Sequence, residues 1–168
     1  EPVHNGGTGA RPHSDGLSAT AYPSGVFGSQ VEITESLAPM IIWRRELRQF
    51  SGGPGQFRGG LGQNIEITSA NGAPFIVFLS VERLKFPPLG RMGGLSGAVG
   101  RIRFRDNDSE LSGKGELRVT ADDYLIFETP GGGGFGPPVE QDPDALRLDV
   151  RRELVSPDGA KNDYGMNL

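Results

Sequence analysis

The 168-residue sequence contains no cysteine, so disulfide bonds and thiolate chemistry are excluded and a cytoplasmic location is the default expectation. Long apolar runs are missing too: no stretch approaches the ~20 residues that a membrane-spanning helix needs, and the first residues do not resemble a signal peptide. Positive charge is not in excess, because the formal net charge is −4. This balance argues against a nucleic-acid partner bound through its phosphates. We therefore expect contact with neither membranes nor nucleic acids.

Histidine is scarce as well, since His4 and His13 are the only two. A zinc site needs three or four ligands, and without cysteine the nearest further candidate is Asp15. His13, Ser14 and Asp15 are neighbours in sequence, whereas the groups of a catalytic triad converge from separate segments. Residues 106–108 (Asp-Asn-Asp) begin like a calcium loop, but the later ligands of such a loop are missing. We expect no metal site in this chain, solvated histidines and a turn at residues 106–108.

Glycine, by contrast, is abundant. The 27 glycines and 13 prolines come near the level at which chains become disordered, but nine phenylalanines and several apolar runs indicate a folded, loop-rich domain. Residues 51–63 (SGGPGQFRGGLGQ) hold six glycines between two strand candidates. Phe57, Arg58 and Leu61 interrupt this run, which favours an ordered loop over a flexible linker. Its glycines would supply positive φ angles or let another backbone approach closely.

The glycine runs also suggest phosphate binding, which needs backbone N–H groups that lead into a helix. Residues 51–63 lead instead into a strand candidate, and residues 131–136 lead into Pro137 and Pro138, which have no N–H to donate. We therefore favour a structural turn role for both runs and expect no nucleotide site in this chain.

Short segments of alternating polarity predict a mainly β fold of the sandwich or barrel-like type, rich in loops. The expected strands cover residues 30–35, 41–48, 64–68, 75–79, 99–104, 116–120 and 124–127. In the second of these, period two places Ile41, Trp43 and Leu47 on one face, so we expect Trp43 to be buried. Residues 75–79 are apolar on both faces, which predicts a central strand, and Asn71-Gly72 predicts a hairpin turn before it.

The end of the chain changes character and predicts a short helical segment. Asp142 and Pro143 have the residue types of a helix cap and a first helical position. The apolar face of this helix would comprise Leu146, Val150 and Leu154. Ser156-Pro157 repeats the same start for a second short helix. We expect a glycine-rich β domain at residues 1–138 and a helical tail at residues 139–168, packed together as one structural unit.

Three charged residues are candidates for contact with a substrate: Arg11, Asp15 and Arg45. Arg11 and Asp15 lie in a loop fixed by glycine and proline, which can hold a guanidinium fork toward a carboxylate or phosphate. The alternative is a salt bridge that braces the loop internally. Period two places Glu35 and Arg45 on otherwise apolar faces of neighbouring strands, where an unpaired charge is costly. These two would pair with each other or with a partner subunit, or Arg45 would contact substrate; no catalytic residue is assigned.

Five motifs occur in a specific order and carry a family resemblance. They are GGTGARPHSDG (6–16), VEITES (31–36), WRREL (43–47, followed by the run at 51–63), ERLKFPPLGRMGG (82–94) and ETPGGGGFG (128–136). Together they cover essentially the whole chain, which resembles the carboxy-terminal part of the B-type subunit of the hydantoinase B/oxoprolinase family. The start at Glu1 rather than at a methionine also suggests a piece of a longer polypeptide or a processed chain.

The resemblance implies membership of an ATP-dependent hydrolase that opens cyclic amides such as 5-oxoproline or N-methylhydantoin. Proteins of that family work with an ATP-binding hydantoinase A-type partner or fused half. The chemistry implied is activation of a weakly electrophilic carbonyl by phosphorylation of its enol or imidate oxygen. ATP with Mg²⁺ and a divalent metal are implied for the full complex, whereas the family's His and Asp metal motifs lie in the amino-terminal portion of the subunit and do not occur here.

By this interpretation the chain supplies scaffold, interface and one wall of a substrate pocket, and it is inactive alone. Its partners would be the A-type subunit and the amino-terminal part of its own subunit, within an oligomer. Two alternatives stay open. One is the ketone carboxylase branch of the same family, and the other is a non-catalytic β module for binding or assembly.

Overall fold

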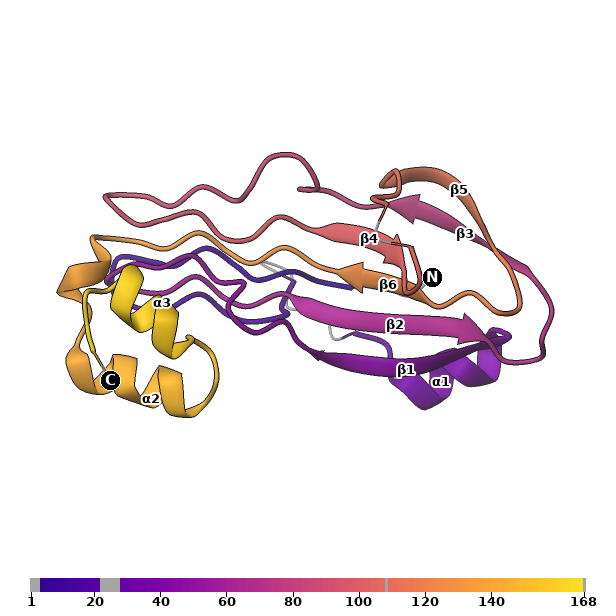
Figure 1. Ribbon diagram of the computed structural model, residues 1–168, viewed down its shortest axis with the longest axis horizontal. Helices are drawn as coiled ribbons and strands as arrows, with labels where there is room; N and C mark the ends of the chain where they lie inside the picture. Colours follow the sequence, from indigo (N-terminus) through magenta and orange to yellow (C-terminus); the bar gives the residue numbers. More distant parts are fainter. Residues whose placement is uncertain (1–3, 22–27, 108, 168) are drawn as a thin grey trace.

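The computed structural model describes residues 4–21, 28–107 and 109–167 as an elongated molecule (Figure 1). Its helices and strands, in chain order, are α1 (Val31–Leu37), β1 (Met40–Leu47), β2 (Gln63–Ser69), β3 (Phe75–Ser80), β4 (Arg101–Phe104), β5 (Lys114–Val119), β6 (Leu125–Glu128), a 3-10 turn at Pro138–Glu140, α2 (Pro143–Arg151) and α3 (Pro157–Asn162). The strands and α1 lie at one end, α2 and α3 lie at the other, and long extended segments run between them (Figure 1).

Two open antiparallel sheets share one apolar core. The larger has the strand order β1-β2-β6-β4, and the smaller pairs β3 with β5. Their buried core residues are Ile65, Ile67, Ile102 and Leu125 from the larger sheet and Leu79 and Val119 from the smaller one. The mainly β prediction is confirmed, and the arrangement is a sandwich of open sheets rather than a closed barrel.

Residues 30–35 form part of a helix, so the strand predicted there is wrong. The Thr34 N–H donates to the Gln30 carbonyl at 3.0 Å, and the Ala38 N–H donates to the Thr34 carbonyl at the same distance. Six residues of alternating polarity are too few to distinguish a strand from one helical turn. Only Thr34 of α1 is buried, whereas Leu37 is 82% exposed.

The core-facing side of β1 is the opposite of the predicted one. Met40 and Ile42 pack against the shared core, while Trp43 is 57% exposed rather than buried. Because Met40 and Ile42 face the core, simple alternation already places Ile41 and Trp43 on the outer face. Alternation gives the period of a strand but not which of its two faces is buried. The register with β2 is also irregular between Ile42 and Arg44.

The strand at residues 75–79 is present as β3, but it is not central, and the predicted hairpin is wrong. Within the described ranges β3 pairs only with β5, and β2 pairs with β1 and β6. The Asn71-Gly72 turn, with a φ of +69° at Gly72, therefore carries the chain from one sheet to the other. A turn signal fixes the local backbone, whereas the partner of each strand is decided by the rest of the fold.

Between the sheets and the helices, five extended segments form a bundle that we call the glycine bundle: residues 5–10, 16–19, 51–62, 88–98 and 129–136. Its backbone hydrogen bonds recur every three residues. Gly7 and Ala10 donate to the carbonyls of Pro130 and Gly133, both at 2.9 Å. This spacing is that of the three-residue turn of polyproline II, not the two-residue period of a strand. Residues 51–63 thus form an ordered structure, as predicted.

Glycine is required in this bundle because the backbones are nearly in contact. A Cβ atom at Gly132 would lie 1.8 Å from the Thr8 carbonyl oxygen, and one at Gly60 would lie 2.1 Å from the Leu17 carbonyl oxygen. No side chain fits in such a space, just as only glycine fits at the axis of collagen. The glycine run therefore positions the backbones that border the candidate site.

The helical tail forms as predicted from its caps. The Asp142 carboxylate accepts from the Asp144 N–H at 3.1 Å, and the Ser156 hydroxyl accepts from the Gly159 N–H at 2.9 Å. A small core of Leu146, Val155, Ala160 and Tyr164 joins α2 to α3. Within the described ranges no helix combines the length and apolar character needed to cross a membrane. The division at residue 138 stays a prediction.

Candidate functional site between the glycine bundle and the helical tail

A buried arginine joins the glycine bundle to the tail. Arg58 is only 5% exposed, and its Nε lies 2.9 Å from Asp149 Oδ2 on α2. Its Nη1 donates to the Gly59 carbonyl at 2.8 Å, and its backbone N–H donates to Asp15 Oδ1 at 2.8 Å. Three segments that are far apart in the sequence therefore meet at one guanidinium group.

Asp15 lies at the edge of this cluster and links its loop to the segment that carries Arg58. Burial raises the pKa of the Asp15 carboxyl above its ordinary value, and the hydrogen bond from the Arg58 backbone and the Arg58 charge oppose that shift. The distance from Arg58 Nη2 to Asp15 Oδ2 is 3.9 Å. The partner of Asp15 is thus Arg58 and not the predicted Arg11, while contact with substrate stays a prediction for Asp15.

Tyr164 lies beside the same cluster. Its side chain is only 6% exposed, and its hydroxyl makes no hydrogen bond within the described residues. Burial raises the pKa of this phenol well above its ordinary range, and the Arg58 charge lowers it only in part. The backbone of Gly55 approaches the hydroxyl without the geometry of a hydrogen bond. Tyr164 is therefore a neutral phenol at all physiological pH values.

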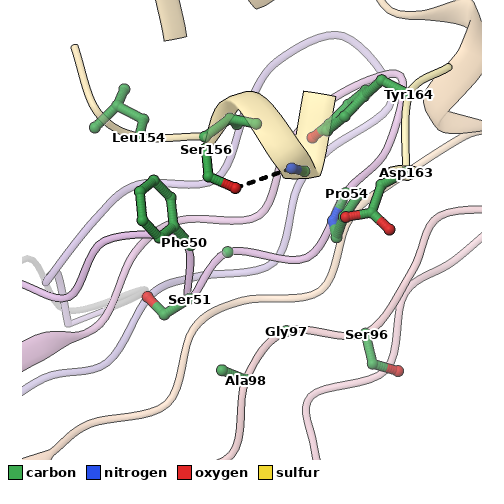
Figure 2. Close-up of a pocket in the computed structure, with 13 residues that line it drawn as sticks. Phe50, Ser51, Pro54, Ser96, Gly97, Ala98, Leu154, Ser156, Asp163 and Tyr164 are labelled. Atoms are coloured by element: carbon green, nitrogen blue, oxygen red, sulfur yellow. Dashed lines mark hydrogen bonds between the residues drawn. The ribbon is translucent and has the colours of Figure 1, made fainter. Parts of the chain in front are cut away.

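A cavity of about 280 Å³ opens between the bundle and α3. Its walls are Phe50, Ser51, Gly52 and Pro54, then Ser96, Gly97 and Ala98, and from the tail Leu154, Val155, Ser156, Gly159, Asp163 and Tyr164 (Figure 2). The Ser156 hydroxyl is already used as the cap of α3. The size matches a small organic molecule, and the walls mix apolar side chains with one carboxylate. The lining also holds hydroxyl groups, from Ser51, Ser96, Ser156 and Tyr164, but no hydrogen bond within the described residues joins one of them to the Asp163 carboxylate. The cavity can therefore bind a small molecule, and no hydroxyl in it is paired with a base.

The other predicted substrate residues lie apart from this cavity's lining. Arg11 is exposed in a tight turn in which its N–H donates to the Ser14 carbonyl at 2.9 Å. Arg45 donates through Nη1 to the Ser29 carbonyl at 2.5 Å and through Nε to Gln63 Oε1 at 3.4 Å. Among the described residues, no hydrogen bond or ion pair links Arg11, Asp15 and Arg45 to one another. Their roles toward substrate stay predictions.

The predicted pairing of Glu35 with Arg45 is wrong. Glu35 lies on α1 and not on a strand, and its Oε1 accepts from the Ile42 N–H at 2.8 Å. A carboxylate that caps the edge of β1 in this way is no longer placed to neutralise a guanidinium group. The predicted pairing assumed that Glu35 and Arg45 lie on neighbouring strands, whereas Glu35 lies on the helix α1.

His4 is half-buried rather than solvated, which corrects a second expectation. Burial lowers the pKa of its imidazole to about 4, and the positive charge of Arg45 adds to this effect. His13 is exposed, as expected. Among the residues that the structure describes, no three His, Asp or Glu side chains gather where a metal ion could bind.

His4 makes stability depend on pH. Because its folded pKa of about 4 lies below the ordinary 6.5, the unfolded chain binds the proton more tightly. Stability from this group is complete above pH 6.5 and is lost as the pH falls toward 4. Between pH 7 and 5 we expect a loss of about 1 kcal/mol, allowing for partial exposure. Urea denaturation of wild type and His4→Asn measures it: the variant should lose this dependence, and His13→Asn should keep it. An unchanged profile in His4→Asn would exclude His4 as the cause.

Sequence reasoning missed the residues that build the site. Arg58 was noted only as an interruption of the glycine run, and nothing linked it to Asp149, which is 91 positions away. The sequence did hold one signal for Asp149. It lies three residues after Leu146, on the side of the predicted helix that was expected to be apolar, so a buried charge with a partner could have been expected there. Tyr164 carries no comparable signal.

Comparison with known proteins identifies the family. Residues 1–138 match the family model described as hydantoinase B/oxoprolinase. The chain belongs to the hydantoinase B/oxoprolinase family. The resemblance inferred from the five ordered motifs is thereby confirmed.

Relatives in this family are much longer than the present chain. The caprolactamase subunit beta of Pseudomonas jessenii is 33% identical over 171 residues, which cover 95% of this chain and 29% of the relative. The 5-oxoprolinase of Dictyostelium discoideum is 34% identical over 135 residues, covering 78% of this chain and 10% of the relative. The chain spans less than a third of either relative and corresponds to one portion of each.

Solved structures of two enzymes share the fold. The crystal structure of the ATP-dependent caprolactamase from Pseudomonas jessenii matches with a TM-score of 0.76 and 28% identity, over 97% of this chain and 30% of that one. A nucleotide-free structure of acetone carboxylase matches with a TM-score of 0.74 and 24% identity, over 95% of this chain and 26% of that one. The second likeness concerns the fold alone.

Proposed function

We propose that this chain is the C-terminal portion of the B-type subunit of an ATP-dependent cyclic amide hydrolase. The observation that carries the proposal is the match to caprolactamase, which extends over 97% of the chain with a TM-score of 0.76. The caprolactamase subunit beta and the 5-oxoprolinase named above are hydrolases of cyclic amides by their names. From these two relatives we infer that the substrate of the enzyme to which this chain belongs is a cyclic amide.

The role of this portion is scaffold and interface, with the cavity beside Tyr164 as a candidate wall of the substrate pocket. Within the described residues there is no metal-binding cluster, and no hydroxyl in the cavity is hydrogen-bonded to the Asp163 carboxylate. Large apolar side chains project from the segment that follows β3, where Phe86 is 76%, Leu89 74% and Met92 75% exposed. Exposed apolar side chains gathered in one segment support a contact of this segment with another part of an assembly. We expect this portion to be inactive by itself.

The remaining parts of the enzyme follow from the family. An A-type subunit would bind ATP with Mg²⁺, and the amino-terminal part of the B-type subunit would hold a divalent metal. The complex would be a cytoplasmic hetero-oligomer. The absence of cysteine is consistent with that compartment.

The second candidate is a ketone carboxylase of the same family, which the fold shared with acetone carboxylase supports. The purified complex separates the two when ATP hydrolysis is followed with either a cyclic amide, such as 5-oxoproline or caprolactam, or a ketone with bicarbonate. We expect ATP hydrolysis to depend on the cyclic amide and to yield the ring-opened amino acid. Turnover that requires bicarbonate and a ketone would instead establish the carboxylase.

A further inference from the structure

The smaller sheet has an open edge along β3. The ladder with β5 continues into the hydrogen bond from the Val81 N–H to the Gly113 carbonyl at 2.8 Å. In an antiparallel pair, bonded and non-bonded positions alternate along each strand. The backbone N–H and carbonyl groups of Leu79, Val77 and Phe75 therefore point toward β5, as those of Val81 do. The intervening residues, Ile76, Phe78 and Ser80, direct their backbone N–H and carbonyl groups away from β5.

These outward backbone groups have no strand partner in the part of the chain that the structure describes. Two strands in isolation make a marginal sheet, and this one is held by its packing on the larger sheet through Leu79 and Val119. The odd-numbered side chains of β3, such as Val77 and Leu79, already pack into the shared core. The sheet is therefore anchored on one face and incomplete at its β3 edge.

The side chains on the outer face distinguish the two edges of this sheet. On β3, Ile76 is 57% and Phe78 is 75% exposed. Directly opposite on β5 lie the charged residues Arg118 and Glu116. Charged side chains protect a strand edge from pairing, whereas an exposed apolar edge strand is a template for another strand. Only the β3 edge has this open, apolar character.

We propose that the free edge of β3 pairs with an extended strand from the rest of the same B-type subunit, which completes a three-stranded sheet and covers Ile76 and Phe78. This inference rests on the proposed function. The chain spans 29% of the caprolactamase subunit beta, so most of such a subunit lies outside these residues and can supply the strand. Pairing through backbone hydrogen bonds needs no charged side chains, and β3 (FIVFLS) has none. The added strand is therefore expected to be apolar on the side that covers Ile76 and Phe78.

Hydrogen exchange in the full-length subunit, measured at single-amide resolution, tests the pairing. The amides of Ile76, Phe78 and Ser80 should exchange at least about 100-fold more slowly than the outward amides of Glu116 and Arg118 on β5. Equal exchange at both edges would overturn the proposal. So would protection that appears only when the A-type subunit is added, or that depends on subunit concentration. Those outcomes would assign the strand to a partner subunit or to a second copy.

A matched pair of proline variants gives a second test. Phe78 and Glu116 are register partners, and the N–H of each points away from the other strand. Proline at either position thus leaves the β3–β5 ladder intact, but only Phe78→Pro removes a bond to an added strand. In the full-length subunit, Phe78→Pro should speed exchange at Ile76 and Ser80 at least about tenfold, and Glu116→Pro should not.

Phe78→Ala separates the loss of the side chain from the loss of the N–H. It should speed exchange less than Phe78→Pro does, because the backbone bond remains. The proposal fails if Phe78→Pro and Glu116→Pro leave the β3 amides equally protected. Neither measurement uses substrate or ATP, so a subunit that proves to carboxylate ketones would refute the proposed function and leave this result untouched.

Discussion

Replacing Asp149 by alanine is expected to release the helical tail from the glycine bundle and to lower the free energy of unfolding by about 3–5 kcal/mol. The variant leaves Arg58, whose side chain is 6% exposed, without its 2.9 Å ion-pair partner. Arg58 would keep its bond to the Gly59 carbonyl and the 3.9 Å contact with Asp15, which favours the lower end of that range. Denaturation of the intact protein, together with limited proteolysis of residues 139–168, measures both effects.

Asp144→Ala is the matched control, because it removes an aspartate from the same helix. Asp144 pairs with Arg147 at 2.7 Å, but its side chain is 88% exposed. Such a surface pair contributes less than about 1 kcal/mol. The double variant Arg58→Met/Asp149→Leu removes both buried charges and should recover most of the stability. If Asp149→Ala and Asp144→Ala lower the free energy of unfolding equally, the buried ion pair does not hold the tail.

Gly132→Ala is expected to disrupt the glycine bundle at its centre. The added Cβ would lie 1.8 Å from the carbonyl oxygen of Thr8 and 2.3 Å from its carbonyl carbon, so two backbones must separate. Gly132 also donates to the Gly60 carbonyl and accepts from the Gly53 N–H, both at 2.8 Å. A loss of at least about 3 kcal/mol in the free energy of unfolding follows, because rigid backbone cannot relax as a side chain does. Urea denaturation and the yield of folded protein measure it.

Gly9→Ala provides the contrast within the same bundle. Its Cβ would lie 3.8 Å from the Gly133 carbonyl oxygen, which is an ordinary van der Waals contact. We expect a change within about 1 kcal/mol, with a small gain from the stiffer unfolded chain. If the two variants lose stability equally, close backbone approach is not the reason for the glycines.

The sequence determined the features whose cause lies within a few residues. Asp142 and Ser156 cap their helices as expected, since a cap needs only an acceptor next to the first N–H groups. Ile65 and Ile67 are buried in a strand as their alternation predicted. The order of the five motifs was sufficient to identify the family.

The tertiary structure alone decided where those elements meet. Trp43 is exposed because the side of β1 that packs on the core is the one with Met40 and Ile42, and alternation along the strand does not decide which side that is. Residues 30–35 were expected to form a strand from their alternating polarity, but the helix α1 covers most of them, because so short a segment fits either pattern.

The candidate site shows the same limit most clearly. Arg58 looked like an interruption of a glycine run, and its role became clear only when the fold placed Asp149 beside it. The sequence left two roles open for the glycines of residues 51–63, positive φ angles or the close approach of another backbone, and the fold shows that close approach is the main one. Local hydrogen bonds and periodicity depend on neighbours along the chain, so the sequence specifies them. Contacts between distant segments depend on how the strands and bundle segments pack, and only the folded chain specifies those.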